Sequence, residues 1–146
     1  MDRTDRTDEF LSDMNNTINA VIRKKKRLYF TVRNEDLHSV VRYLIDKMGC
    51  RLSTATAMET YSSIEVLYQF SHDPSGYFYC PRIVITDKEQ PKMNSISPLL
   101  KGAEWIEREM YELWGIKFEG HPGLEPLLTG NHPQGLKVPL RFRRTQ

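Results

Sequence analysis

Apolar residues in the first third of the chain recur mostly at helical spacing. From Asp8 to Lys24 they fall on one helix face, which predicts an amphipathic helix with a narrow apolar stripe. The stripe consists of Phe10, Leu11, Met14, Ile18, Val21 and Ile22. A second helix is predicted from Asn34, which can cap it, to Gly49, which suits the position just after a helix end. Its apolar face consists of Leu37, Val40, Val41, Leu44, Ile45 and Met48.

A basic run, RKKKR, occupies residues 23–27 at the predicted end of the first helix. Cations are favoured there because the C-terminal end of a helix carries partial negative charge. This interpretation explains the run without a ligand. A nucleic-acid-binding patch is the alternative.

Strand-like alternation follows the basic run. In RLYFTVR the residues Leu28, Phe30 and Val32 face one way, and Tyr29 and Thr31 face the other.

Three more strands are predicted, at 51–60, 62–71 and 77–86, with the turn sequence HDPSG before the last of them. Pro81 predicts that this last strand lies at a sheet edge or carries a bulge, because proline cannot donate to a strand ladder.

The order of elements is therefore α-β-α-β-β-β. The last three strands are expected to form an antiparallel meander, and the two helices to cover one face of a mixed sheet. The predicted fold class is α+β, a two-layer domain followed by a charged C-terminal helix and an extended proline-rich tail.

The character of the chain changes after the last predicted strand. Residues 87–102 are expected to be irregular and to lead out of the core, and 103–114 to form a short helix. No regular element is predicted beyond Gly115, although apolar residues recur there, so this tail needs a surface on its own domain or on a partner. The expected organisation is 1–86 as an α+β core and 87–146 as linker, charged helix and partner-binding tail, within a single domain overall.

Composition narrows the class of protein. A chain of 146 residues fits one domain that buries a core without staples, and a net charge of +2 does not by itself imply a polyanionic partner. Cys50 and Cys80 are expected to be buried thiols in a reducing compartment, with a single disulfide as the alternative. The N-terminus has no signal-peptide pattern and no apolar run reaches the roughly 20 residues that span a bilayer, so a soluble or peripheral cytoplasmic protein is expected.

Catalytic chemistry finds little support in the sequence. No nucleophile with an adjacent base is evident, and the glycines of GIKFEGHPG lack the flanking strand and helix of a phosphate-binding loop. His121 and His132 each precede a proline and have no third ligand at metal spacing, so a metal site is not favoured. A stand-alone hydrolase using Glu107, Glu109 or His121 is kept as a rival hypothesis.

The segment AEWIEREMYELWG places Arg108 at i,i+4 spacing from both Glu104 and Glu112. Its apolar side chains are Trp105, Ile106, Met110, Leu113 and Trp114. Two interpretations stay open: a solvated helix face joined by ion pairs, or a helix partly buried against another protein, where Arg108 holds two carboxylates.

These residues carry a resemblance. AEWIEREMYELWGIKFEGHPGLEPLLTG, followed by GLKVPLR, closely resembles the C-terminal signature of the 30 kDa subunit of respiratory NADH:quinone oxidoreductase, complex I. The same module occurs as a small hydrophilic subunit of membrane-bound, energy-converting [NiFe] hydrogenases. The matching positions are Trp105, Glu107, Arg108, Glu109, Glu112, Gly115, Phe118, Gly120, His121, Pro122, Leu124, Leu128, Pro139, Leu140 and Arg141.

Some positions depart from the complex I pattern. Two arginines are usual where this chain has Glu125-Pro126, and Trp114 replaces a usual Phe or Leu. GNHPQG stands where an acidic pair and a tryptophan are common, and His132-Pro133 within it matches no fixed feature of the family. A Leu-Pro-Leu-Leu-like sequence around Glu125-Pro126 is closer to the hydrogenase branch, and the choice between the two branches stays open.

The resemblance implies a non-catalytic structural and assembly subunit of a membrane-associated electron-transfer complex. It implies docking on the large, 49 kDa-like subunit that is related to [NiFe] hydrogenase. It implies no cofactor in this chain; iron–sulfur clusters, and a [NiFe] centre in the hydrogenase branch, belong to partner subunits. The chain would reach the membrane only through the complex, on its cytoplasmic side, and would bind no nucleic acid. The implied interface residues are Trp105, Glu107, Arg108, Glu109, Glu112, Trp114, Phe118, His121, Pro122, Leu140 and Arg141.

The main rival from another class is a small nucleic-acid-binding module. It would use RKKKR and RFRR (residues 141–144), with Tyr29 and Tyr77 for base stacking. The aromatic residues are not interleaved with the basic runs, and acidic residues nearly balance basic ones, so this interpretation is disfavoured.

Overall fold

The computed structural model describes residues 6–123, and the structure confirms the predicted α+β class with a mixed sheet. Five strands form the main sheet in the order β1-β2-β5-β4-β3, and two short strands form a second sheet. The elements are α1 (Thr7–Asp13), β1 (Ile18–Arg23), β2 (Arg27–Val32), η1 (Asn34–Asp36), α2 (Leu37–Arg42), η2 (Tyr43–Lys47), β3 (Arg51–Glu59), β4 (Ile64–His72), β5 (Tyr77–Ile85), β6 (Lys92–Asn94), α3 (Ala103–Trp114) and β7 (Lys117–Glu119).

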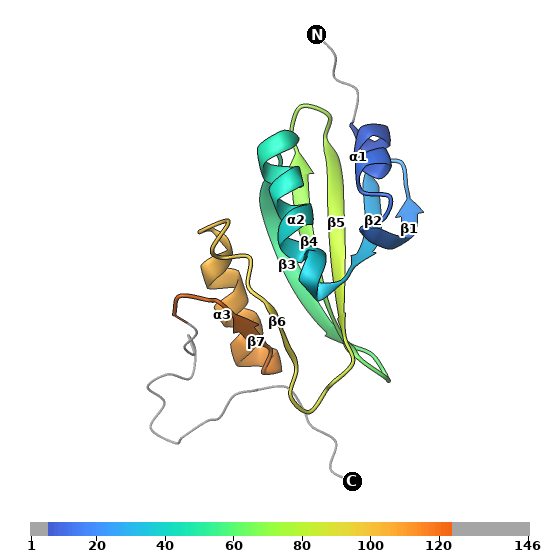
Figure 1. Ribbon diagram of the computed structural model, residues 1–146. Coiled ribbons are helices and arrows are strands. Elements are labelled where there is room, and N and C mark those ends of the chain that lie inside the picture. The colour runs from blue at the N-terminus through green and yellow to red at the C-terminus, as the bar shows by residue number, and fades with distance from the viewer. Residues whose placement is uncertain (1–5, 124–146) are drawn as a thin grey trace.

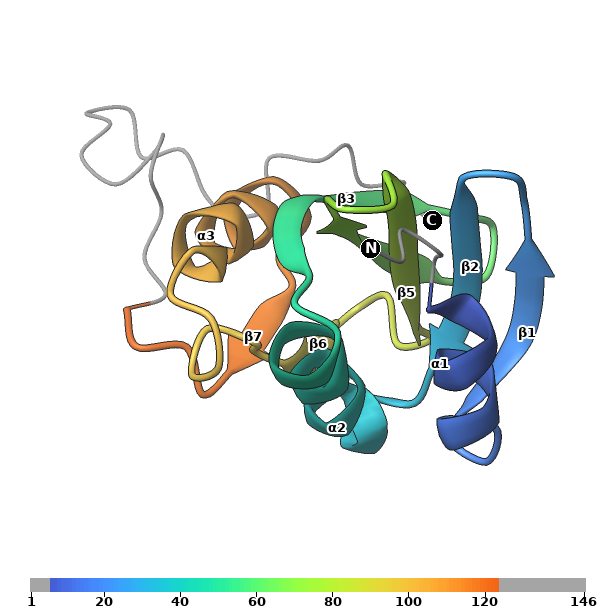
Figure 2. The same cartoon turned by 90° about the horizontal axis from the view of Figure 1, so that it is seen from above.

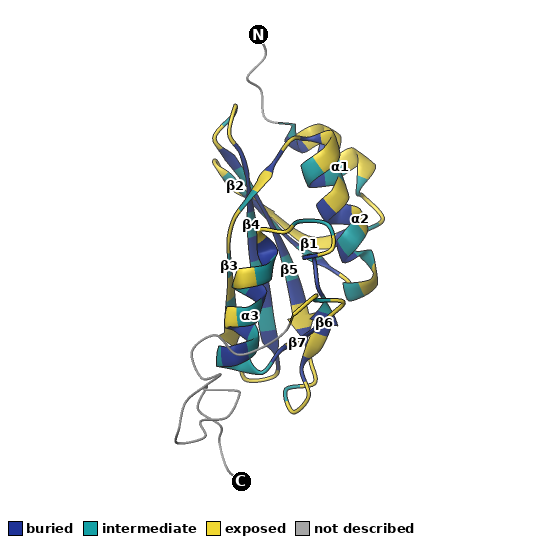
Figure 3. Ribbon diagram, turned by 90° about the vertical axis from the view of Figure 1, so that its left-hand side faces the viewer, coloured by how far each residue is buried: buried dark blue, intermediate teal, exposed yellow. Residues whose placement is uncertain are grey.

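One face of the main sheet is covered and builds the core. Helices α1 and α2 lie on the same side of it (Figures 1 and 2). Alternate residues of β2 and β4 are buried, as period-2 alternation requires, and buried positions meet the helices in the interior (Figure 3). The core side chains from this face are Leu28, Phe30, Val32, Ile64, Val66, Tyr68, Phe70, Tyr79, Ile83 and Ile85.

The meander prediction is confirmed. β3 pairs antiparallel with β4, and β4 antiparallel with β5, whereas β2 pairs parallel with β5. The second helix is also confirmed along its apolar face, with Leu37, Val40, Val41 and Leu44 fully buried. It begins as a 3-10 turn at Asn34 and its last turn is a π-helix, after which Gly49 adopts a φ of +71°.

The prediction of one long first helix is wrong. Helix α1 ends at Asp13, and the chain turns at Met14, whose carbonyl accepts bonds from the N–H groups of Thr17 and Ile18. Residues from Ile18 onward form β1, antiparallel to β2. The apolar spacing was helical, but its second half contains β-branched residues that a neighbouring strand can recruit, so tertiary pairing overrode the periodicity.

The position of Pro81 was also wrongly predicted. Strand β5 is central in the sheet, and the register on the two sides of the proline is unchanged, so there is neither an edge nor a bulge. Bridges between β4 and β5 stop at Leu67↔Arg82 and resume at Phe70↔Tyr79. The missing N–H of proline is therefore accommodated by a local gap in that ladder.

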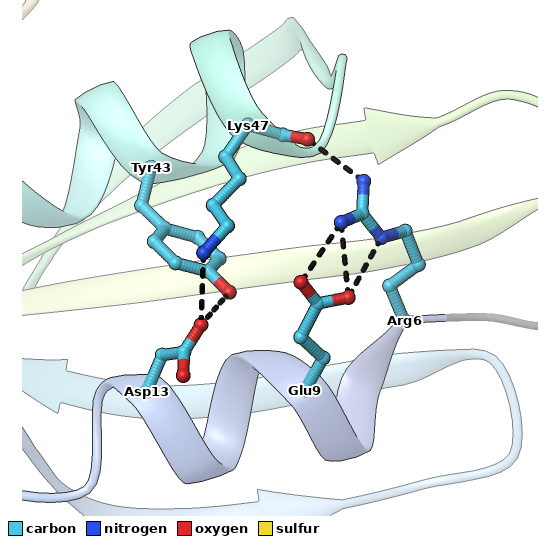
Figure 4. A network of polar contacts seen from close by, with 5 residues as sticks. All are labelled: Arg6, Glu9, Asp13, Tyr43 and Lys47. Carbon is cyan, nitrogen blue, oxygen red and sulfur yellow. Dashed lines mark hydrogen bonds and ion pairs between the residues drawn. The ribbon is translucent and has the colours of Figure 1, made fainter.

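A polar network fastens α1 to the end of the second helix (Figure 4). The carboxylate of Asp13 accepts hydrogen bonds from Tyr43 Oη (2.5 Å) and Lys47 Nζ (3.2 Å). Arg6 pairs with Glu9 and donates to the Lys47 carbonyl at 2.7 Å. The bond from Tyr43, followed by that from Lys47, lowers the pKa of Asp13, whereas desolvation and then the bond to Asp13 raise the pKa of Tyr43.

The segment after β5 was predicted to be irregular, and this is partly wrong. β6 and β7 pair in parallel, with Met93 opposite Phe118, and both side chains are buried in the common core cluster. Both strands have only three residues, too short for alternation to reveal them.

Two further findings concern the described residues. Cys50 and Cys80 are buried free thiols, as expected, rather than a disulfide. Within residues 6–123, no helix is long and apolar enough to cross a bilayer.

Candidate partner-docking site around helix α3

Helix α3 has the predicted bounds, Ala103–Trp114. It ends as predicted at Gly115, whose φ of +75° is a left-handed conformation and whose N–H donates to the Tyr111 carbonyl at 2.8 Å. Ala103 and Met110 face inward and are buried. The inner side of the helix is therefore packed against the core, and the residues that do not face the core form its outer side.

A buried carboxylate anchors that inner side. Glu107 is fully buried and accepts four hydrogen bonds. Its Oε1 accepts from the hydroxyls of Ser95 (2.5 Å) and Ser97 (2.6 Å). Its Oε2 accepts from the Ile96 N–H (3.0 Å) and the Tyr68 hydroxyl (2.9 Å). Four donors occupy the acceptor sites of one carboxylate, so the group is satisfied without contact with water.

The four bonds tie α3 to β4 and to the loop after β6. Burial, and then the negative charge of Glu107, raise the pKa of Tyr68 well above its ordinary value, so this phenol stays protonated and donates. The loop is held from the other side by His38 on α2, whose Nε2 donates to the Ser95 carbonyl at 2.6 Å. Asn34 also reaches this region: its side-chain oxygen accepts from the Asn94 N–H at 2.7 Å rather than capping α2.

The outer side of α3 carries an exposed aromatic and a cation. Trp105 is 62% exposed, and the guanidinium carbon of Arg108 lies 5.8 Å from the centre of its ring. Glu109 is exposed beside them, and Trp114 is partly buried at the helix end. A cation–π pair at an exposed position is worth about 0.5–1 kcal/mol, enough to favour one arrangement of the two side chains.

The chain then folds back against the start of α3. His121 Nε2 donates to the Glu104 carbonyl (2.9 Å), and its Nδ1 accepts from the Gly123 N–H (3.0 Å). This pair of bonds requires the tautomer with its proton on Nε2. Gly120 precedes it with a φ of +89°, a conformation that favours glycine. His121 therefore positions the start of the tail, and Pro122 beside it is exposed.

The predicted interface residues divide into three groups. Glu107, Glu112 and Phe118 are buried within this chain. Trp105, Arg108, Glu109, Trp114, His121 and Pro122 have exposed or partly exposed side chains. Leu140 and Arg141 lie outside the described residues, as do His132-Pro133 and the second basic run. A solvated charged face is therefore the wrong description of α3 at Glu107 and Glu112.

Sequence reasoning missed the partners of Glu107, namely Tyr68, Ser95, Ile96 and Ser97, and the supporting His38. These residues are brought together by long-range contacts that no local spacing shows. One signal was available: Glu107 lies four residues after Ala103 and three before Met110, which places it on the apolar stripe. A glutamate at a core position of a helix predicts burial with hydrogen-bond partners.

Acid–base and metal chemistry gain nothing from this geometry. Glu107 is closed off from solvent and its oxygens are occupied, so a substrate cannot reach it in this structure. Within residues 6–123 no three His, Cys, Asp or Glu side chains gather as metal donors.

Comparison with known proteins decides the family. The family model described as "Respiratory-chain NADH dehydrogenase, 30 Kd subunit" matches residues 30–144. The chain belongs to this family. The resemblance predicted from the last third of the sequence is confirmed, and the match extends over most of the strands as well.

Curated relatives agree with this assignment. The corresponding NADH-quinone oxidoreductase subunit of Rhodobacter capsulatus is 34% identical over 106 residues, which cover 70% of this chain and 53% of the relative. That of Chloroherpeton thalassium is 30% identical over 121 residues, 77% of this chain and 48% of the relative. In both matches, this chain spans about half the length of the family member.

Solved structures share the fold of this family member. A trypsin-resistant fragment of Nqo5 superposes with a TM-score of 0.70 at 20% identity, covering 82% of this chain and all of the fragment. A chain of an archaeal respiratory membrane complex, the membrane-bound sulfane sulfur reductase, gives a TM-score of 0.71 at 20% identity, covering 91% of this chain and 76% of its own length.

Proposed function

We propose that this chain is a non-catalytic structural and assembly subunit of a complex I-like, membrane-associated electron-transfer complex. It docks on the large subunit related to [NiFe] hydrogenase, through the outer side of α3 and the tail that follows it. Family membership supports the first statement. The second rests on the pair formed by the exposed Trp105 and the partly exposed Arg108.

The outer side of α3 has the properties of an interface anchor. Tryptophan and arginine are enriched among residues that dominate binding energy, and a rigid support lowers the entropic cost of binding. Here the pair sits on a helix whose opposite side is locked by the four bonds to Glu107. Charged neighbours such as Glu109 would then contribute orientation and specificity more than net affinity.

Cofactors and location follow from the same proposal. Iron–sulfur clusters, and a [NiFe] centre if the complex is of the hydrogenase type, belong to the partner subunits, because the two cysteines of this chain are fewer than a cubane cluster needs. The chain is peripheral and reaches the cytoplasmic side of the membrane through the complex. Identifying the subunits that co-purify from native membranes would distinguish the NADH-linked from the hydrogenase branch.

The docking proposal is tested with Trp105→Ala and Arg108→Ala in the full chain, co-expressed with the large subunit. Each substitution is expected to weaken assembly by about 2 kcal/mol or more, a thirtyfold or greater rise in Kd, as for residues that dominate an interface. Circular dichroism of the isolated variants should match the wild type, because both side chains lie outside the core.

Two matched controls separate docking from a general surface effect. Tyr61→Ala removes an aromatic that is 96% exposed on the turn between β3 and β4, and Arg42→Ala removes an exposed cation on α2. Both should leave partner recovery unchanged. If Trp105→Ala and Arg108→Ala recover the partner as well as these controls do, α3 is not the docking element.

A further inference from the structure

The basic run of the sequence has a different setting from the one its spacing predicted. Residues 23–27 form the turn and flanks of the β1–β2 hairpin, not a helix end. The helix-dipole explanation therefore does not apply. Arg23 pairs with Asp8 at 2.8 Å, and Arg27 lies 4.9 Å from the centre of the Phe78 ring. The cations that remain exposed, without an ion pair to other described residues, are those of Lys24, Lys25 and Lys26.

The backbone of this turn is held from inside the molecule. Tyr77 donates its hydroxyl hydrogen to the carbonyls of Lys24 (2.9 Å) and Arg27 (3.1 Å), and the Phe78 N–H donates to the Lys26 carbonyl at 3.0 Å. The Lys24 N–H closes the turn on the Arg27 carbonyl at 2.8 Å. With these backbone groups satisfied internally, the hairpin presents three lysine side chains from a fixed support.

Two apolar side chains lie next to these lysines in an unusual arrangement. Val21 is 42% exposed and Ile22 is 48% exposed, although alternation along a strand would normally bury one of two neighbours. β1 is an edge strand, and every one of its residues after Ile18 is exposed. Its register with β2 also shifts between Asn19 and Ile22, where Ala20 has a φ of +50°, the one positive value among the non-glycine residues described. Both aliphatic side chains are therefore exposed on the edge strand, close in sequence to the three lysines.

We propose that the tip of the β1–β2 hairpin, Val21 to Lys26, is a docking site for an anionic phospholipid surface. Lysines gain affinity from the negative potential of such a surface, and exposed aliphatic side chains gain by entering the boundary between headgroups and acyl chains. Binding of a single-stranded nucleic acid favours aromatic or arginine planes for base stacking, and the arginine within this segment, Arg23, is paired with Asp8. Tyr77, a stacking candidate in the nucleic-acid interpretation, is buried, and its hydroxyl donates to the backbone of the turn.

The location of the hairpin leaves α3 available at the same time. β1 and α3 lie at opposite ends of the molecule in two perpendicular views (Figures 1 and 2). A lipid contact at the hairpin therefore does not compete with a protein contact at α3. The lipid proposal is independent of the proposed partner, because the full chain alone can be tested.

The test is co-sedimentation of the full chain with vesicles of phosphatidylcholine mixed with phosphatidylserine, compared with pure phosphatidylcholine vesicles. Binding is expected only to the anionic vesicles and should fall as salt is raised. Replacing Lys24, Lys25 and Lys26 together by glutamine should lower the partition coefficient on the order of 100-fold, because each lysine contributes about fivefold at such a surface. Val21→Ser with Ile22→Ser should weaken binding but keep its salt dependence.

A charge-matched control decides whether the site or the net charge is responsible. Lys92, Lys101 and Lys117 are exposed and lie far from the hairpin in sequence, and their triple replacement by glutamine changes the net charge equally. This control should bind vesicles like the wild type, and circular dichroism should show all variants folded. Equal losses in the two triple variants, or no binding to anionic vesicles at low salt, would overturn the proposal. Stronger lysine-dependent binding to polyglutamate or to mixed RNA, insensitive to Val21→Ser and Ile22→Ser, would overturn it in favour of a polyanion site.

Discussion

Substitution of Glu107 tests whether the buried carboxylate stabilises the fold. Glu107→Ala leaves donors without an acceptor inside the core. The buried Ile96 N–H, in the loop after β6, and the buried Tyr68 hydroxyl, on β4, would both lose their acceptor. Each unsatisfied donor costs about 1–3 kcal/mol, so the free energy of unfolding should fall by about 2–6 kcal/mol. That is a large part of the roughly 5–15 kcal/mol that stabilises a typical domain.

Glu107→Gln should cost much less, because its amide can be accommodated. An amide oxygen placed at the Oε2 position still accepts from the Ile96 N–H and the Tyr68 hydroxyl. The amide NH₂ then faces the hydroxyls of Ser95 and Ser97, which can rotate and accept instead of donating. The loss is the difference between charged and neutral hydrogen bonds, which we expect to be about 1–2 kcal/mol in total.

Urea unfolding followed by far-UV circular dichroism measures both values. Glu109→Ala is the matched control, because Glu109 is an exposed glutamate on the same helix and should change stability by less than about 0.5 kcal/mol. The reasoning is refuted if Glu107→Ala destabilises no more than Glu109→Ala, or if the Gln variant is as unstable as the Ala variant. The second outcome would mean that the four donors cannot reorganise.

Further expectations concern glycines and thiols. Gly115→Ala should destabilise by about 1–2 kcal/mol because of its left-handed φ, whereas Gly102→Ala, at a φ of −61° in open space, should be neutral or slightly stabilising in the same unfolding assay. Burial raises the pKa of Cys50 to about 12 and that of Cys80 to about 11. The thiols of the unfolded chain ionise near about pH 8.5, so their contribution is complete below that pH and is lost as pH rises toward 11 to 12. Each protein is measured by thermal unfolding, and its melting temperature at each pH is expressed relative to its own value at neutral pH. Between about pH 8.5 and about 11, the melting temperature of the wild type should fall more steeply than that of a Cys80→Ala variant.

Much of the fold could be predicted because its signals are local. Alternation along residues 28–32 and helical spacing along residues 37–48 each reflect one buried side, and the structure buries those sides. Gly115 likewise predicts the end of α3, because glycine readily adopts the left-handed conformation found there. Where a residue type and its nearest neighbours determine the conformation, sequence reasoning was right.

The failures share a different cause, which is pairing between distant segments. β1 exists because β2 lies beside it, although its own apolar spacing is helical. β6 exists because β7 lies beside it, and its three residues are too few to show a pattern. Pro81 is tolerated in a central strand because the surrounding register is fixed by the residues on both sides. The hydrogen-bond partners of Glu107 come from β4 and from the loop after β6. Sequence spacing does not show that these two segments lie next to α3.

The signature that identifies the family therefore serves two physical purposes within a few residues. Glu107, Phe118 and His121 hold α3 and the following turn against the core, whereas Trp105 is exposed and Arg108 lies partly exposed beside its ring. Substitutions in the first group should reduce stability and partner recovery together, because they disturb the element that presents the surface. Substitutions in the second group should reduce recovery alone. A signature residue is thus assigned to docking only when its substitution lowers partner recovery and leaves stability unchanged. Glu107 is fully buried, so we expect its substitution to lower partner recovery by destabilising the fold.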